Sequence, residues 1–210
     1  MELQGFPLIK DPEQNFWYGG SQEWYRKRFG RLAGCGPTCA ANLAAFYGVG
    51  TRPDMGLLDA SPLYSKDHYL SLMDRTYQYV KPGMMGFPWR DKFQEKFLRY
   101  AFDNGVSFST DYVEGWSEIE TPLNFIRSEL NAGRPLALLI LGHTEITLDD
   151  ETWHWMALTG YIPEAGKILV STYGRRKYLD AGLVFRPHKK NDVHLISFHK
   201  KSASITNLMG

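Results

Sequence analysis

The residues with the clearest potential for chemistry are Cys35 and His154. Cys35 stands between two glycines in the run Gly34-Cys35-Gly36-Pro37. Proline is favoured in the first turn of a helix, where its missing N–H costs nothing. The unpaired N–H groups and partial positive charge of a helix start favour a thiolate over a thiol. Cys35 is therefore a candidate nucleophile, and the alternative interpretation is a small residue in a tight turn.

His154 is the best-placed histidine to assist this thiol. A helix start stabilises a nearby anion by only about 0.3–1 kcal/mol, less than one pKa unit. A strong thiol nucleophile therefore needs a cationic partner, and an imidazolium is the usual one. His154 lies in the apolar and aromatic run Trp153–Tyr161, which predicts a strand. A histidine buried there needs a partner for its ring, so the alternative is a hydrogen-bonded core residue.

The second cysteine, Cys39, falls one turn inside the predicted helix. It shares an apolar face with Leu43, Phe46 and Tyr47, so we expect it to be a buried packing residue. A metal pair with Cys35 would have the right i, i+4 spacing, but no second Cys or His pair completes a site. We expect no metal and no cofactor, and two cysteines cannot form a disulfide framework.

The order of these residues along the chain matches that of papain-like peptidases, with a helix-start Cys followed 119 residues later by a strand His. The sequence resembles the bacteriocin-processing (double-glycine) peptidases of this papain-like superfamily. The resemblance covers about residues 20–48 and 130–178. It is carried by four segments: Gly34-Cys35-Gly36-Pro37-Thr38 with residues 40–48, Asn131-Ala132-Gly133-Arg134-Pro135-Leu136, His154-Trp155 with Thr159-Gly160-Tyr161, and Val170-Ser171-Thr172-Tyr173-Gly174.

The resemblance implies a papain-like fold and a thiol hydrolase that cleaves a peptide or related amide bond. Cys35 would attack the carbonyl as a thiolate, and His154 would accept and then deliver the proton. The residue that orients the imidazole is Asn or Asp in the family. Here that position carries Ser171, or Thr172 under a one-residue shift. If Cys35 is a thiolate, iodoacetamide would alkylate it well below pH 8.

The resemblance also implies an amide donor upstream of Cys35 that stabilises the oxyanion with the Cys35 backbone N–H. The family usually has a Gln about six residues before the Cys, and Phe29 occupies that place. The nearest Gln is Gln22, thirteen residues before Cys35. Residues 24–32 would have to loop out to bring it to the thiol. The alternative is that Gln22 is a surface amide.

Two other functions remain open on the same scaffold. The Ser171 and Phe29 departures are compatible with a catalytically impaired domain that binds peptides. An acyl transferase, transglutaminase-like or phytochelatin-synthase-like, would pass the thioester to an amine instead of water. The partner is in each case expected to be a peptide or protein.

The elements that must position these residues are predicted to form one α+β domain spanning residues 1–210. The first 30 residues indicate an ordered loop region with one short helix. Apolar spacing and capping signals then predict helices from Pro37 to Gly48 and over 66–80, 89–102 and 121–131, with Thr121 as a cap. Strands are expected over 136–141, 153–161, 167–173, 177–179 and 193–198. We expect one antiparallel sheet packed on the helices.

The composition excludes several other classes. The chain has 210 residues, a net charge of +1, 43% hydrophobic and 14% aromatic residues. These values argue against nucleic acid as the main partner and against a disordered chain. No apolar run is long enough for a transmembrane helix. Met1–Gly5 lacks a basic and apolar start, so we expect no secretory signal and a cytoplasmic location.

Basic and aromatic residues near the site allow two interpretations. Residues 26–28 with Arg31, and residues 175–177, are basic. They form either a solvated rim or a positive cleft edge that attracts acidic peptide segments. The six tryptophans are expected to be mostly core residues, with one or two lining a substrate groove.

Overall fold

The computed structural model describes residues 1–201. Its helices are η1 (Gln22–Trp24), α1 (Arg28–Ala33), α2 (Cys35–Tyr47), α3 (Lys66–Tyr79), α4 (Arg90–Asp103), α5 (Glu120–Asn131), η2 (Ile146–Glu151), η3 (Pro163–Ala165) and α6 (Ala181–Val184), where η marks a 3-10 helix. Its strands are β1 (Leu8–Lys10), β2 (Phe16–Tyr18), β3 (Leu57–Leu58), β4 (Ser61–Ser65), β5 (Phe108–Glu114), β6 (Leu136–Gly142), β7 (His154–Ile162), β8 (Lys167–Thr172), β9 (Arg175–Asp180) and β10 (Asp192–Lys200). The fold is α+β.

The strands form two sheets. A six-stranded sheet runs in the order β5-β10-β6-β7-β8-β9, and all of its neighbouring strands are antiparallel. A smaller four-stranded sheet, β2-β1-β4-β3, contains one parallel pair, β1 with β4. The prediction of a single antiparallel sheet is therefore wrong, since the smaller sheet comes from segments too short to give a periodic signal.

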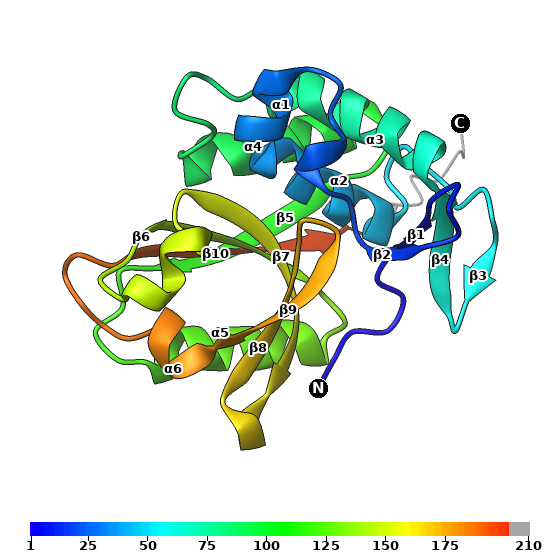
Figure 1. Cartoon of the computed structure of the whole chain (residues 1–210). Helices are drawn as coiled ribbons and strands as arrows, with labels where there is room; N and C mark the ends of the chain where they lie inside the picture. Colours follow the sequence, from blue (N-terminus) through cyan, green and yellow to red (C-terminus); the bar gives the residue numbers. More distant parts are fainter. Residues whose placement is uncertain (202–210) are drawn as a thin grey trace, which may run out of the picture.

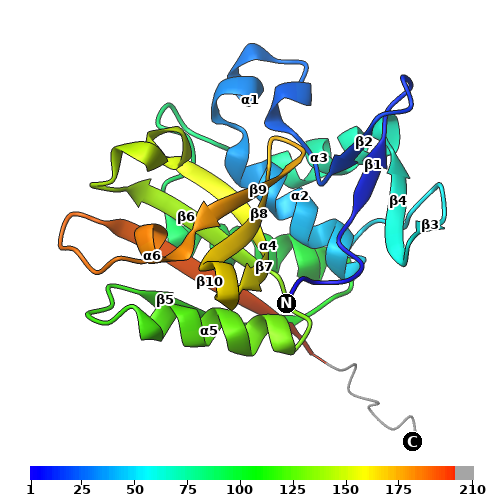
Figure 2. The same ribbon diagram turned by 60° about the horizontal axis from the view of Figure 1, so that its bottom comes forward.

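The six-stranded sheet is covered on both faces, and the two faces belong to two hydrophobic clusters. Leu139 on β6 faces the cluster formed with α2, α3 and α4, whereas its neighbours Leu138 and Ile140 face the cluster formed with α5 and α6. This alternation follows from the two-residue period of a strand. Figures 1 and 2 show α1–α4 on one side of the sheet and α5 on the other. No helix within residues 1–201 is long and apolar enough to cross a membrane.

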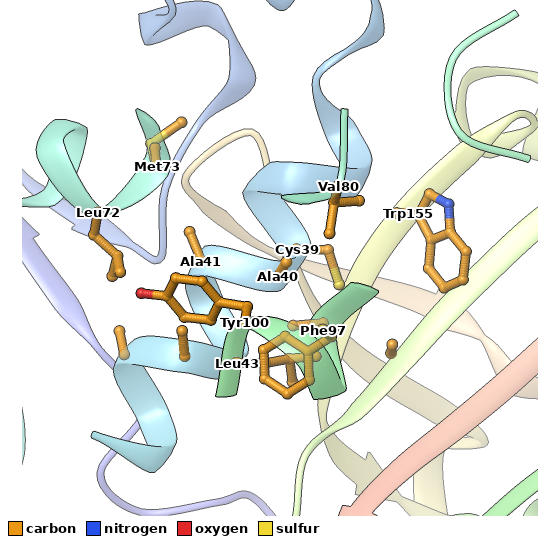
Figure 3. Packing of buried hydrophobic residues seen from close by; sticks show 14 of the residues in the cluster. Cys39, Ala40, Ala41, Leu43, Leu72, Met73, Val80, Phe97, Tyr100 and Trp155 are labelled. Carbon is orange, nitrogen blue, oxygen red and sulfur yellow. The ribbon is translucent and has the colours of Figure 1, made fainter. Parts of the chain in front are cut away.

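Helix α2 is the central helix, as its apolar spacing predicts. Every residue from Cys35 to Ala45 is buried, and the helix contacts α3, α4 and β7. Its run of alanines allows this close packing, and the helix ends at Gly48 with φ of 66°. Cys39 lies in the same cluster as Val80 and Phe97 (Figure 3). The prediction that Cys39 is a packing residue agrees with this position.

The ends of the predicted helices and strands agree with the structure within two residues, whereas most of the short elements were not predicted. Strands β6 to β10 and helices α2 to α5 correspond to predicted segments. Thr121 is not a helix cap, because α5 already begins at Glu120 and Ile119 occupies the cap position without a side-chain hydrogen bond. Four short strands between residues 8 and 65, and β5 in the expected helical half, were missed. Where one short helix was expected in the first 30 residues, the structure has η1 and the start of α1, which extends to Ala33.

Candidate active site

Cys35 is the first residue of α2, directly after Gly34, which ends α1 and precedes α2. A Cβ at Gly34 would lie 2.3 Å from the Gly30 carbonyl oxygen and 2.6 Å from the Tyr25 ring. A Cβ at Gly36 would lie 3.1 Å from the Phe87 side chain. The two glycines therefore allow α2 to pack closely against its own neighbours, so that the thiol is held at the helix start.

Cys35 is 7% exposed, and its thiol points to the carbonyl oxygen of Trp153 at 3.9 Å. Burial raises the pKa of this thiol, while backbone N–H groups of Trp155, Gly36 and Cys35 itself act in the opposite direction. The helix start thus offsets part of the cost of forming a buried thiolate. At neutral pH the resting side chain is the thiol.

His154 is the first residue of β7, and its ring is buried. The ring nitrogen Nε2 lies 2.8 Å from Oγ1 of Thr172, and the ring stacks on Tyr173 at 4.9 Å between centroids. Burial, together with the charge of Lys177, lowers the pKa of His154 to about 4. The imidazole is therefore neutral at pH 7, so neither Cys35 nor His154 carries the charge that the thiolate–imidazolium pair expected from the sequence would have.

The hydroxyl that contacts His154 belongs to Thr172. Of the two residues that the sequence offered for orienting the imidazole, Thr172 therefore replaces Ser171. The Ser171 hydroxyl donates to the Tyr18 carbonyl oxygen at 2.6 Å and accepts from Nδ2 of Asn42 at 3.3 Å. Consecutive side chains of β8 point to opposite faces. The register of β8 on β7, with Ser171 opposite Ala157, turns Ser171 toward α2 and Thr172 toward His154.

Gln22 is brought to the site by the loop that the sequence required. The segment that loops out between η1 and Cys35 contains helix α1. Gln22 lines the same small cavity as Cys35 and His154. Its side chain is buried; Nε2 donates to the Arg31 carbonyl oxygen at 2.8 Å, and Oε1 has no hydrogen-bond partner within residues 1–201. Gln22 is therefore not a surface amide.

Asn42 was missed by the sequence reasoning. Its Oδ1 accepts from the Gly20 N–H at 2.8 Å and from the Tyr69 hydroxyl at 2.7 Å, and its Nδ2 contacts Ser171. This one buried amide joins α2 to α3, to β8 and to the segment just before Gln22. A polar residue in an otherwise alanine-rich helix was the available signal.

Two strained residues flank the His154–Thr172 pair. Trp153 has φ of 56° and Tyr173 has φ of 50°, a left-handed conformation that costs of order 1–3 kcal/mol for residues other than glycine. Trp153 immediately precedes His154, and Tyr173 immediately follows Thr172. Such strain concentrates at functional sites, where it fixes the direction of neighbouring side chains.

Two surface grooves lie beside this cavity. The first, here called the apolar groove, is lined by Cys35 with Phe29, Leu32, Met84, Met85 and Trp153. The second, the basic groove, is lined by Thr172 and Tyr173 with Glu23, Arg175, Arg176 and Lys177. Each groove shares lining residues with the Cys35–His154 cavity. Trp153 is a tryptophan that lines a groove instead of the core, one of the two roles expected for this residue type.

Arg31 and Cys39 have structural contacts. The Arg31 guanidinium donates to the carbonyl oxygens of Tyr25 and Arg26 and so holds the η1–α1 turn. The Cys39 thiol donates to the Met156 carbonyl oxygen at 3.3 Å. No group of three or more His, Cys, Asp or Glu side chains within residues 1–201 is arranged to hold a metal ion.

The structure thus brings Cys35, His154, Gln22, Ser171 and Thr172 around one cavity, from η1, α2, β7 and β8. A thiol, an imidazole held by a hydroxyl and a buried amide are groups that acyl transfer can use. No protein-family model and no curated protein sequence matches the chain.

Proposed function

We propose that the protein is a papain-like thiol hydrolase that cleaves a peptide or related amide bond. Cys35 is the nucleophile, His154 the general base, Thr172 the residue that orients the imidazole, and Gln22 the oxyanion donor. The observation that carries the proposal is the convergence of Cys35, His154 and Gln22 on one cavity, with Nε2 of His154 held by Thr172.

The neutral resting pair determines how the reaction starts. When Thr172 accepts a hydrogen bond from Nε2–H, Nδ1 carries the lone pair that can act as a base. As the Cys35 sulfur attacks the substrate carbonyl carbon, the thiol proton passes to Nδ1. The carbonyl electron pair moves onto oxygen. The Cys35 N–H stabilises this oxyanion together with the second N–H of Gln22 Nε2, whose first N–H donates to the Arg31 carbonyl.

The tetrahedral intermediate then collapses to a thioester. The C–N bond breaks, and the imidazolium delivers its proton to the leaving amine. Water attacks the thioester after giving a proton to His154, and the thiol is regenerated as the carboxylic acid leaves. These two steps need no external oxidant, reductant or cofactor.

Alkylation of the two cysteines by iodoacetamide tests the proposal without a known substrate. Peptide mapping should find Cys35 modified in the folded protein and Cys39 unmodified, because only Cys35 lines a surface groove. His154→Ala should slow modification of Cys35, because the base is lost. His188→Ala is the matched control, because His188 is exposed. Equal labelling of Cys35 and Cys39, or an unchanged rate in His154→Ala, would contradict the proposal.

Peptide binding without turnover is the second candidate function. It is favoured by the raised pKa of Cys35 and the lowered pKa of His154, both caused mainly by burial, since neither group is charged at rest. Under this function a Cys35→Ser variant binds peptide as tightly as the wild type, and the wild type yields no cleavage product by mass spectrometry.

A further inference from the structure

We infer that the substrate is a peptide with a bulky apolar side chain on one side of the reacting bond and an acidic side chain on the other. The apolar side chain would occupy the apolar groove, and the acidic one would lie over Arg175 in the basic groove. The inference rests on the proposed function for the position of the reacting bond, which lies at Cys35 between the two grooves.

The apolar groove has the size and lining of a side-chain site. Its volume is about 390 Å³, and none of its lining residues is charged. Ligand sites are hollows of about 300–1,000 Å³ with mainly apolar walls. Leu32 and Met85 expose 69% and 67% of their surface, and covering such a cluster of apolar side chains is favourable.

The methionine wall of this groove is held in place by a tight turn. Gly83 and Gly86 exchange two backbone hydrogen bonds of 2.8 and 2.9 Å, so Met84 and Met85 occupy the tip between them. The next residue, Phe87, accepts a hydrogen bond of 2.6 Å from the buried indole of Trp155. The turn is therefore anchored to β7, the strand that begins with His154. Methionine side chains adapt to apolar ligands of different shapes.

The apolar groove is also the larger opening at the nucleophile. The cavity enclosed by Cys35, His154 and Gln22 has a volume of only about 10 Å³, which is room for about one water molecule. Cys35 lines both this cavity and the apolar groove. A substrate residue next to the reacting carbonyl is thus brought into the apolar groove.

The basic groove has one cation available for a ligand. Arg176 pairs with Glu2, and Lys177 pairs with Glu151. Within residues 1–201 none of the ion pairs includes Arg175, which is exposed. Among the described residues that line this groove, Glu23 is the one acid. A carboxylate on the substrate would complete a pair with Arg175, whose planar guanidinium can bind it with two hydrogen bonds.

Binding of labelled decapeptides to the Cys35→Ala protein tests the inference separately from turnover. The peptides are built of Ala, Gly and Ser and carry one Leu and one Asp, in both orders and at several separations. Matched peptides carry Ser for Leu or Lys for Asp. Fluorescence anisotropy should show at least about tenfold tighter binding of the best Leu/Asp peptide than of either matched peptide.

Each groove is tested by one substitution in its lining and one control substitution elsewhere on the surface. Leu32→Asp should abolish the preference for Leu, while Leu57→Asp, equally exposed at 69% on β3, should leave it unchanged. Arg175→Glu should reverse the preference from Asp to Lys, while Arg52→Glu, also exposed, should not. Circular dichroism checks that each variant is folded.

The outcomes separate this inference from the proposed hydrolysis. Wild-type cleavage of all peptides at equal rates overturns the inference and leaves the hydrolase in place. Preferential binding without any cleavage supports the assignment of the apolar and acidic side chains to the two grooves and overturns the hydrolase. A Leu32→Asp protein that changes only its oligomeric state in size-exclusion chromatography, with peptide binding intact, assigns the apolar groove to a second copy of the chain and overturns the inference.

Discussion

Nε2 of His154 lies 2.8 Å from Oγ1 of Thr172, the last residue of the neighbouring strand β8. A hydroxyl at this place can accept a hydrogen bond from the imidazole but adds no negative charge. Burial and Lys177 lower the pKa of His154 to about 4, and a nearby carboxylate would have acted against that shift. The choice of threonine thus fits an imidazole that is neutral at rest and that, in the proposed mechanism, becomes charged only during attack.

Replacing Thr172 by Val should lower the rate of Cys35 alkylation and of peptide turnover by about 10- to 100-fold, because the imidazole loses the partner that sets its tautomer. Thr172→Ser should retain most of the rate, since it keeps the hydroxyl. Thr110→Val is the matched control, because Thr110 on β5 also loses one side-chain hydrogen bond, from Gln94. An unchanged rate in Thr172→Val would remove Thr172 from the mechanism.

Acid should destabilise the fold through His154. Its pKa is about 4 when folded and about 6.5 when unfolded, so the unfolded chain binds more protons between these values. The free energy of unfolding should therefore decrease as the pH falls from 6.5 to 4. His154 alone should account for about 3 kcal/mol of this decrease. Urea unfolding at pH 7 and at pH 4 measures this loss of stability.

The His154→Gln protein should lack this part of the pH dependence, because glutamine does not titrate. His188→Gln, at an exposed position, should lose as much stability as the wild type on acidification. Equal losses in the wild type and His154→Gln would show that the histidine is not buried in its neutral form.

Replacing Gln22 by Ala should separate turnover from alkylation. Loss of an oxyanion donor lowers turnover by about 100- to 1,000-fold, whereas alkylation by iodoacetamide forms no oxyanion and should keep its rate. Gln78→Ala is the control, since Gln78 is exposed on α3, away from the cavity lining. A parallel loss of both rates would instead assign Gln22 to holding the η1–α1 turn through Arg31.

Gly34→Ala should destabilise the protein by about 1–3 kcal/mol, because the new Cβ would overlap the Gly30 carbonyl and the Tyr25 ring. The resulting shift at the start of α2 should also slow Cys35 alkylation. Gly142→Ala is the matched control, since its Cβ would have no contact closer than 3.8 Å. Thermal unfolding and the alkylation rate give the two measurements, and equal stability of the two variants would contradict the close packing at Gly34.

The amino-acid sequence by itself identified the elements whose signals are local. The proline and alanines after Cys35 predicted α2, and the apolar spacing around Cys39 predicted its burial. The long apolar runs predicted strands β6 and β7, because a continuous apolar run indicates a buried strand from the local sequence alone. Cys35 and His154 stood out as candidates for the same reason, since each has an unusual local context.

Only the tertiary structure decided the relationships that depend on register and packing. Ser171 and Thr172 are adjacent in sequence, and the pairing of Ser171 with Ala157 determines which hydroxyl reaches His154, since a shift by one residue exchanges the two faces. Gln22 reaches the cavity only because α1 turns back on η1. The apolar groove joins Leu32, Met85 and Trp153 from three distant segments, and burial of the site, a property of the whole fold, keeps its thiol and imidazole neutral.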